Sequence, residues 1–528
     1  MTLPRIEHAR LARSAMVCTV DHLASVAAIT MLGRGGSAAD AAVAASAVQA
    51  VTTQHMCGMG GDLWALVHID GSPPRSLNAA GRAGSGITAD SLRAEGHTEM
   101  PFKGNIASTS VPGCVDGWLA LHEAHGRLDL GTVLAPAIDA AANGFPAAPQ
   151  LAMSIPAVAG VHGNDDFFPQ GTAARAGQII TRPGLARSLE AIVAAGRDGW
   201  YGGEFGEGLV RVGGGVFTEA DLVESQAEWV APVGVEAWGH KLWTVPPPSQ
   251  GYLAPAAAGV LQHHDVPDDP QDPLWGHLLI EAAKQVAVDR IARLHDAADG
   301  PSLLASDDLA RRAANISLDQ AAALGGPATG GGTIYMCVVD SDRMAVSLMQ
   351  SNASGFGTHL TIPEIGVFLH NRAAGFSLTP GHPAEFAPGR KPPSTLSPAL
   401  ITNAGAGDRF RTTIGAMGGD GQPQVVLQMA ARLLHNRQRV GETITMPRFT
   451  LTVPEASGFN TWTRPEDLVV ALEAGSGWGE SLTQKGHRIE ECQWGLGLFG
   501  HAHLIDADDT TLAGAADPRA WTGAAIGL

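Results

Sequence analysis

Residues 330–351 read GGGTIYMCVVDSDRMAVSLMQS, and this stretch decides the fold that the sequence predicts. Two runs rich in apolar and β-branched residues, 333–340 and 344–351, flank the polar stretch Ser341–Arg343. That pattern predicts a β-hairpin. Because a glycine run that resembles a linker ends just before Thr333, the hairpin would begin with a threonine.

Outward from the hairpin, further strands and helices follow without the regular alternation of a doubly wound sheet. Residues 63–69 (LWALVHI) and 409–415 (RFRTTIG) predict strands, while 37–51 (SAADAAVAASAVQAV) and 274–296 have helical spacing of apolar residues. The sequence therefore predicts an α+β fold in which two sheets lie between helical layers.

Composition narrows the class of protein. The chain has 528 residues, of which 45% are hydrophobic and 16% charged, and its formal net charge is −18. An acidic surface disfavours nucleic acid and anionic membranes as partners, although one buried arginine can still make a pocket attract anions. We find neither a secretory signal nor an uninterrupted apolar run of about 18 residues, so we expect a cytoplasmic protein without a membrane span.

No metal or organic cofactor is expected. The five cysteines are far apart, odd in number and without C-x-x-C spacing, which favours reduced, mostly buried thiols over a zinc site or a disulfide framework. They are Cys18, Cys57, Cys114, Cys337 and Cys492. The histidines of QHHD (262–265) have no spaced partner that would complete a metal site.

Thr333 is the candidate nucleophile. Glycine can adopt strained backbone angles before it, which would help the threonine hydroxyl attack the carbonyl of Gly332. Water would then release an N-terminal threonine, whose α-amine titrates near pH ~8 and can act as the base. A flexible linker before a strand is the alternative, and the string GGGT alone favours it.

Two further motifs offer hydrogen bonds to a substrate. Gly418 and Gly419 follow a predicted strand, and their N–H groups could hold the oxyanion of a tetrahedral intermediate, although the glycine pair alone favours an ordinary strand-to-helix turn. Ser394 and Thr395 follow Lys391–Pro392–Pro393, so their hydroxyls stand on a stiffened loop. A capped surface turn is the alternative there.

Arg82, in NAAGRAGSG, and Arg372, in LHNRAAGF, are the candidate arginines. Either could clamp a carboxylate through two parallel hydrogen bonds. A surface salt bridge is the alternative for any single arginine.

Taken together, the motifs resemble the gamma-glutamyltransferase family of N-terminal-nucleophile hydrolases over almost the whole chain. The first half carries GGSAADAAVAA (35–45), CGMGGDLWALV (57–67), SVPGCVDGW (110–118), GWYGGE (199–204), PPPSQG (246–251) and LIEAAKQVAVDR (279–290). The second half carries TIYMCVVD (333–340), GFGTHL (355–360), PSTLSP (393–398), AMGGDGQPQ (416–424), MPRF (446–449) and ADPRAWTGAAIG (516–527).

The resemblance implies a four-layer αββα sandwich, so residues 1–528 would form one domain where length alone suggests several. It also implies a proenzyme that cuts itself between Gly332 and Thr333 into a large subunit, 1–332, and a small subunit, 333–528. The two subunits would stay associated, as a dimer of heterodimers.

Roles carried over by position complete the expected site. Thr333 is the nucleophile, Gly418 and Gly419 form the oxyanion hole, and Ser351 stands where the family has a threonine that supports the nucleophile. Ser394 and Thr395 match the hydroxyl pair that holds the substrate's α-carboxylate.

The amine-recognition residues of the transpeptidases are changed. Where they carry an acid in a motif like N-N-Q-M-D-D-F, this chain has HNRAAGF (370–376), so Gly375 replaces the acid and Arg372 adds a positive charge. The family's asparagine becomes Ala353, with Asn352 beside it. The arginine of the family's R-E-x-A-P motif falls at Ala80, with Arg82 two residues on.

We therefore expect an amidohydrolase whose substrate is a small-molecule amide with a carboxylate and no α-amine on its acyl group. Arg82, Arg372, Ser394, Thr395 and Asn352 are its expected substrate-binding residues. A γ-glutamyl hydrolase or transpeptidase is the first alternative, and an uncleaved relative that only binds an acyl ligand is the second.

Overall fold

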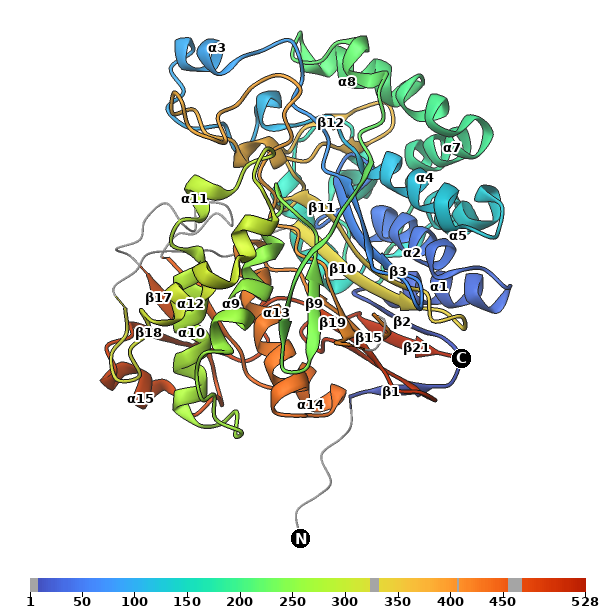
Figure 1. The fold of residues 1–528 in the computed structure, drawn as a ribbon. Coiled ribbons are helices and arrows are strands. Elements are labelled where there is room, and N and C mark those ends of the chain that lie inside the picture. The colour runs from blue at the N-terminus through green and yellow to red at the C-terminus, as the bar shows by residue number, and fades with distance from the viewer. Residues whose placement is uncertain (1–7, 323–331, 406–407, 454–467) are drawn as a thin grey trace.

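In the described part of the computed structural model, two sheets of seven strands each lie face to face, with helices on both outer faces (Figure 1). The structure describes residues 8–322, 332–405, 408–453 and 468–528. This arrangement confirms the predicted α+β class and its αββα layers.

The predicted hairpin lies near the middle of one sheet. Its strands pair from Gly332 opposite Ala353 to Val339 opposite Ala345, with a shift of register between Gly332 and Thr333. The strand order of this sheet is β21 (Ala524–Gly527), β2 (Met16–Thr19), β10 (Gly332–Val339), β11 (Ala345–Ala353), β3 (Asp62–His68), β4 (Arg75–Ala79) and β7 (Glu228–Val230). Each neighbouring pair is antiparallel.

The second sheet is also antiparallel, and it packs on the first. Its order is β1 (Arg10–Ala12), β20 (Leu512–Ala516), β19 (Ala502–Ala507), β15 (Phe410–Ala416), β14 (Ala399–Asn403), β9 (His240–Thr244) and β8 (Val233–Ala237). Gly415 of β15 lies directly over the ring of Tyr335 in β10, where a Cβ would come within 2.4 Å of a ring carbon. The absence of a side chain there lets the two sheets approach closely.

One helical layer covers the sheet that contains the hairpin, and it appears blue to green in Figure 1. Its main helices are α1 (His22–Gly33), α2 (Ala38–Thr52), α4 (Cys114–His125), α5 (Leu130–Asn143), α7 (Pro183–Tyr201) and α8 (Glu204–Gly213). Helix α2 is buried along its whole length, as its small side chains predict, and Ser37 caps it by accepting a hydrogen bond from the N–H of Asp40.

The other layer covers the second sheet with α9 (Leu253–Leu261), α10 (Pro273–Ala287), α12 (Ser306–Ala313), α13 (Gln422–Ala430) and α14 (Val440–Thr445). The prediction of one helix over 274–296 is wrong. Helix α10 ends at Ala287, and the short α11 (Arg290–Arg293) follows a turn at Asp289, whose backbone (φ −109°, ψ 11°) leaves the helical range. The turn allows Arg290 to reach Asp420.

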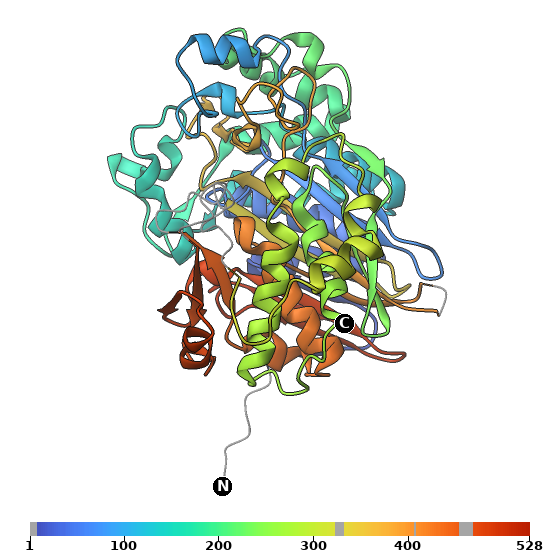
Figure 2. The same ribbon diagram turned by 60° about the vertical axis from the view of Figure 1, so that its left-hand side comes forward.

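Smaller elements complete the described chain. They are β5 (Phe145–Pro146) with β6 (Ile179–Ile180), β12 (Thr361–Ile362) with β13 (Val367–Phe368), the helices α3 (Ala89–Ala94), α6 (Pro149–Ser154) and α15 (Gly479–Gln484), and a sheet of β16 (Phe449–Thr452), β17 (Val469–Glu473) and β18 (Ile489–Cys492). Figure 2 shows that last sheet, in red, at the edge of the molecule. Within the described ranges, no helix has the length and apolar character needed to cross a membrane.

Both sheets draw strands from both sides of the bond between Gly332 and Thr333. In the hairpin sheet, β10 lies between β2, which comes from the start of the chain, and β11, and β11 in turn pairs with β3. In the second sheet, β9 pairs with β14 and β1 pairs with β20. The two segments that this bond separates are therefore interleaved.

Candidate active site

Two hydroxyl groups and one carbonyl group meet at the open end of the hairpin. The Thr333 Oγ1 lies 2.8 Å from the Ser351 Oγ, and the Ser351 hydroxyl donates to the carbonyl oxygen of Gly332 over 2.6 Å. The N–H of Ala353 donates to the same Ser351 oxygen over 2.8 Å. All of these groups are buried. The structure thus brings the predicted nucleophile, its predicted support and the predicted cleavage site together.

The direction of the hydrogen bonds follows from proton counting. A serine hydroxyl has one proton, and that of Ser351 is donated to Gly332. Thr333 must therefore donate its own proton to Ser351. Among the described residues, Ser351 is the one side chain that hydrogen-bonds the Thr333 hydroxyl, so no histidine or carboxylate contacts it directly.

Gly332 is required by space. A Cβ at this position would come within 2.4 Å of the carbonyl oxygen of Ser354. Any other residue would therefore force β10 and the segment after β11 apart, and would move the carbonyl that Ser351 contacts.

Asp62 extends this row across a third strand. Thr333 is paired with Ser351, and Ser351 with Asp62, in adjacent antiparallel strands, where paired side chains share a face. Asp62 binds the guanidinium of Arg372 through two hydrogen bonds, of 2.7 Å to Nε and 3.2 Å to Nη2. The sequence analysis missed Asp62, although it stands at the start of a predicted strand directly after CGMGG.

Arg372 is fully buried, so the surface salt bridge considered as its alternative is wrong. Its Nη1 donates to the Thr395 hydroxyl over 3.0 Å, which joins two predicted substrate-binding residues. Because both charges of the pair are out of water, their mutual hydrogen bonds are essential to keeping them there. Contact of Arg372 with a substrate carboxylate stays a prediction.

Gln250 links the Thr395 loop to the predicted oxyanion turn. Its Nε2 donates to the carbonyl oxygens of Thr395 (3.2 Å) and Gly419 (3.1 Å). Its backbone N–H donates to the carbonyl of Ser394 over 2.9 Å, and the N–H of Ser394 donates to Pro248 over 2.7 Å. The PPPSQG turn therefore holds the Ser394–Thr395 loop through hydrogen bonds, a role that the motif alone did not reveal.

The predicted oxyanion turn has a backbone that only glycine adopts readily. Gly418 has φ 145° and Gly419 has φ 56°, directly after β15. Within the described part of the chain, neither N–H donates to another group of the protein. Both donors are thus available to a ligand, while the oxyanion role itself stays a prediction.

Neighbouring groups hold this turn from two sides. The N–H of Met417 donates to the carbonyl of His501 over 3.0 Å, and Asp420 accepts a hydrogen bond of 2.8 Å from the Arg290 Nη2. Burial lowers the pKa of His501 to about 4, with a smaller opposing effect of Asp517. The imidazole is therefore neutral at pH 7 and adds no charge beside the turn.

A pocket of about 680 Å³ opens beside these groups. Thr395 and Gly375 form part of its wall, and so do Phe376 and Arg290. Sites that bury drug-sized ligands have about 300–1,000 Å³, so this pocket has the volume of a binding site.

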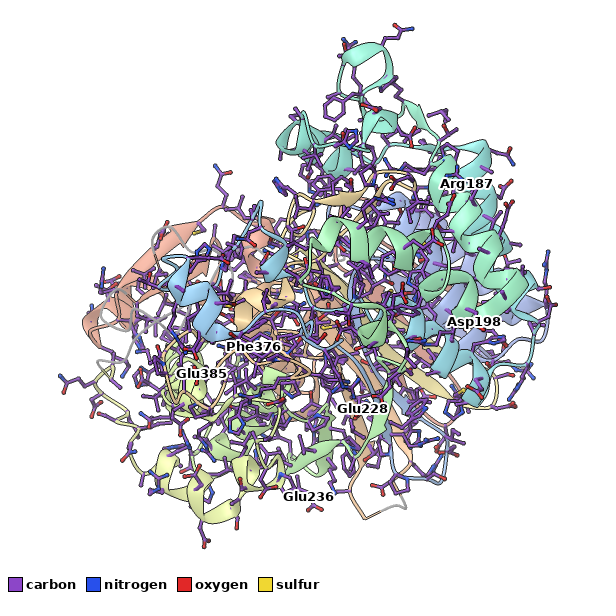
Figure 3. The ribbon with its side chains drawn as sticks, turned by 90° about the horizontal axis from the view of Figure 1, so that it is seen from above. Arg187, Asp198, Glu228, Glu236, Phe376 and Glu385 are labelled. Atoms are coloured by element: carbon purple, nitrogen blue, oxygen red, sulfur yellow. The ribbon has the colours of Figure 1, made fainter. Side chains whose placement is uncertain are left out.

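Two predicted substrate-binding residues lie apart from this group. Arg82 is half-exposed, lies 3.7 Å from Glu228 and donates to the carbonyl of Ser225. Figure 3 shows Glu228 well separated from Phe376 of the pocket wall. Asn352 turns to the opposite face of β11 from Ser351 and donates to the carbonyl of Gln54. The structure does not bring either residue to Thr333.

A cluster that the sequence analysis missed has metal-ligand chemistry. His277, Glu281 and His487 are buried, and their ligand atoms lie within 4.8 Å of one another. The Lys284 ammonium already occupies this cluster, at 2.7 Å from Glu281 and 3.4 Å from the His487 Nδ1. His487 then contacts His277, which contacts the carbonyl of Ser317. A lysine cation among the ligands makes this a hydrogen-bonded chain and disfavours a metal cation.

Comparison with known proteins gives one consistent likeness. A family model described as gamma-glutamyltranspeptidase matches residues 24–527. The glutathione hydrolase-like YwrD proenzyme of Bacillus subtilis (strain 168) is 33% identical, over 97% of this chain and 98% of that protein. The oxamate amidohydrolase proenzyme of Klebsiella pneumoniae subsp. pneumoniae is 32% identical, over 97% and 98%. The crystal structure of cephalosporin acylase from Bacillus halodurans superimposes with a TM-score of 0.89 at 29% identity, over 100% of this chain and 98% of that one.

Proposed function

The chain belongs to the gamma-glutamyltranspeptidase family and is an amide-cleaving hydrolase, and from this we propose the bond it cuts in itself and the kind of amide it hydrolyses. It cuts itself between Gly332 and Thr333, and it then hydrolyses the amide of an acyl compound that carries a carboxylate but no α-amine. The observation that carries this proposal is the contact of one serine hydroxyl with both the Thr333 hydroxyl and the Gly332 carbonyl.

Maturation begins with the Thr333 hydroxyl oxygen attacking the Gly332 carbonyl carbon. The hydroxyl proton passes to Ser351, which gives its own proton to the carbonyl oxygen and so stabilises the charge that develops there. Collapse of the intermediate breaks the carbon–nitrogen bond, and the amine of Thr333 takes up the proton. Water then hydrolyses the resulting ester, leaving a Gly332 carboxylate and a free α-amine on Thr333.

Turnover uses the same hydroxyl with a new base. The free α-amine has an ordinary pKa near ~8, and it accepts the hydroxyl proton while the oxygen attacks the substrate carbonyl. The N–H groups of Gly418 and Gly419 receive the oxyanion, and the leaving amine takes the proton. Water resolves the acyl-enzyme by the reverse transfer.

The substrate preference rests on Gly375. This residue stands where the resemblance places the acid that grips an α-amino group. A Cβ here would come within 2.6 Å of the carbonyl oxygen of Pro393, so the backbone leaves no room for an acidic side chain. Arg372 and Thr395 lie nearby and suit an anion better than an ammonium group. Two of the relatives, an oxamate amidohydrolase and a cephalosporin acylase, are named for substrates other than γ-glutamyl compounds, which agrees with this direction.

Two chromogenic amides test the preference, because glutaryl-p-nitroanilide and γ-glutamyl-p-nitroanilide differ by a single amino group. We expect kcat/KM to favour the glutaryl compound by at least about tenfold, since a charged hydrogen bond contributes about 1.5–3 kcal/mol. Equal or reversed rates would favour the second candidate, γ-glutamyl hydrolysis, which the 33% identity to a glutathione hydrolase-like protein supports.

The cleaved subunits are proposed to remain together, as a dimer of heterodimers. The interleaving of strands in both sheets supports the association of the two segments within one heterodimer. Native mass spectrometry of the purified enzyme should find both fragments in one particle, with two copies of each. Free fragments in the native spectrum would contradict the association, and a single pair would contradict the dimer.

A further inference from the structure

The large pocket has a guanidinium group on its wall. Among the described residues that line it, Arg290 is the one arginine or lysine. Glu99 lies at the exposed rim, and burial lowers the pKa of the half-buried His382, so that imidazole is neutral at pH 7. The attraction of the pocket for an anion therefore depends on Arg290.

One nitrogen of the Arg290 guanidinium has a partner in the protein. Its side chain is 8% exposed, and its Nη2 donates to the Asp420 carboxylate over 2.8 Å. A guanidinium has five N–H donors, and no other Arg290 nitrogen donates to a residue in the described ranges. Its Nε is buried without an acceptor. Arg290 therefore has donors that its pair with Asp420 does not use, and the guanidinium lies on the pocket wall.

The other candidate arginines are already occupied. Arg372 uses Nε and Nη2 for Asp62 and Nη1 for Thr395, and it does not line the pocket. Arg82 lies outside the wall as well, beside Glu228. Of the three, Arg290 is the one that combines a place on the wall with donors to spare.

The position of Arg290 relative to the reacting atoms also fits. Its partner Asp420 directly follows Gly418 and Gly419, whose N–H groups face no described acceptor. Thr395 lies on the same pocket wall and is tied through Gln250 to Gly419. Arg290, through Asp420, and Thr395, through Gln250, thus place the pocket wall next to the oxyanion turn.

We propose that Arg290 binds the free carboxylate of the acyl group, so that the substrate is a monoamide of a dicarboxylic acid longer than two carbons. The inference rests on the proposed function and moves carboxylate recognition from Arg82 and Arg372 to Arg290. The pocket volume of about 680 Å³ supports a longer acyl chain, because a two-carbon acyl group would fill little of it.

Matched substrates and variants test the assignment in the mature enzyme. Glutaryl-p-nitroanilide and valeryl-p-nitroanilide differ in a carboxylate against a methyl group. Arg290→Gln should raise KM for the glutaryl compound by about 10- to 100-fold more than for the valeryl compound, on which any loss reflects the ion pair with Asp420 that the substitution also breaks. Arg293→Gln is the control, because Arg293 lies on the same short helix but pairs with Asp289 and Asp308, away from the pocket wall.

The outcomes separate this inference from the proposed function. If the wild-type enzyme hydrolyses both compounds equally well, the proposed preference for a carboxylate fails. If it prefers the glutaryl compound and Arg290→Gln keeps that preference, another residue binds the carboxylate and the inference is wrong. An equal loss on both compounds would mean that Arg290 acts only by holding Asp420, which also overturns it.

Arg290→Lys keeps the test decisive if the glutamine variant does not accumulate. Lysine preserves the charge but lacks the forked guanidinium that can donate to Asp420 and to a ligand at the same time. We expect this variant to retain part of the glutaryl preference and to shift its best substrate toward the longer adipyl amide. An unchanged preference for glutaryl over both valeryl and adipyl amides would contradict contact with residue 290.

Discussion

Two buried aspartates lie at opposite ends of the central hairpin, and they are held in different ways. At the turn, Asp340 accepts hydrogen bonds from the backbone N–H groups of Asp342 and Met344 at one oxygen and of Ala38 at the other. At the open end, Asp62 accepts two hydrogen bonds from the side chain of Arg372.

The difference assigns Asp340 to the stability of the sheet and Asp62 to the active site. Main-chain donors are fixed by the fold itself, so Asp340 joins the turn to the start of α2, and no side chain among the described residues donates a hydrogen bond to its carboxylate. Arg372 continues to the Thr395 hydroxyl, which lies on the wall of the large pocket. The end held by side chains can therefore respond to a substrate, and the end held by backbone stabilises the sheet.

Removing the nucleophile should have the largest effect. Thr333→Ala takes away the hydroxyl that donates to Ser351, so we expect the full-length chain to accumulate and turnover to fall below detection. Thr333→Ser keeps a hydroxyl and should retain some processing and some activity. Denaturing gels and intact mass measure both. An alanine variant that still yields fragments meeting at residues 332 and 333 would refute the assignment of the nucleophile.

Replacing each of the two aspartates by asparagine tests the comparison directly. Asp62→Asn leaves the Arg372 charge buried and poorly paired, a defect that costs about 3–5 kcal/mol in comparable buried pairs, so kcat/KM should fall by at least about 100-fold. Asp340→Asn weakens an acceptor of three N–H groups, and it should lower the free energy of unfolding by about 1–3 kcal/mol while kcat/KM changes less than about threefold.

Steady-state rates and thermal unfolding of the same two variants provide the measurement. The comparison fails if Asp340→Asn loses as much activity as Asp62→Asn at a temperature where both are folded. Arg372→Lys sharpens it, because lysine keeps the charge but cannot form both hydrogen bonds to Asp62 in the same geometry.

Ser351 should have an intermediate effect. Ser351→Ala removes the donor to the Gly332 carbonyl, and we expect processing to slow by about 10- to 100-fold, at or below the lower end of the roughly 10²–10³-fold cost of losing a single oxyanion donor. Ser351→Thr keeps the hydroxyl and should process at a rate closer to wild type. Ser347→Ala is the matched control on the same face of β11, where the serine bonds Tyr335 and the Ala399 carbonyl. A gel time course that shows equal slowing in both alanine variants would argue against a specific role.

Acid should lower the stability of the folded protein, and this effect should be smaller than those above. Burial lowers the pKa of His501 to about 4 and that of His503 to about 3. Between pH 6.5 and 4 the unfolded chain therefore binds protons that the folded protein does not, and stability falls as the pH falls. The melting temperature should drop over this range, and His503→Gln should make the drop shallower. The same slope in the variant would contradict this account, and His263→Gln, at an exposed position, serves as the control.

The sequence predicts what is local and periodic. It places the hairpin and the capped alanine-rich helix, because strand spacing and small-residue patterns are visible along the chain, whereas the place of Ser351 beside Thr333 comes from the family resemblance. The period of two would also have placed Asn352 on the opposite face from Ser351, a consequence that the motif comparison overlooked.

Contacts between distant segments could not be predicted in this way. Asp62 and Arg372 are 310 positions apart, and Gln250 and Gly419 are 169 apart, so no local pattern joins them. The break after α10 was also hidden, since apolar spacing continues through it and the ion pair of Arg290 with Asp420 exists only in the folded protein. Charged candidates can be found along the chain, but their partners are decided by the fold.

The interleaved strands have a consequence for the lifetime of the protein. Cleavage before Thr333 would turn a molecule that folded as one chain into two chains whose strands alternate in both sheets. After complete denaturation, such a molecule would have to find its partner by diffusion, so recovery would slow on dilution, while the uncut precursor would refold at any concentration. Each enzyme molecule would then have one efficient opportunity to fold, before it becomes active.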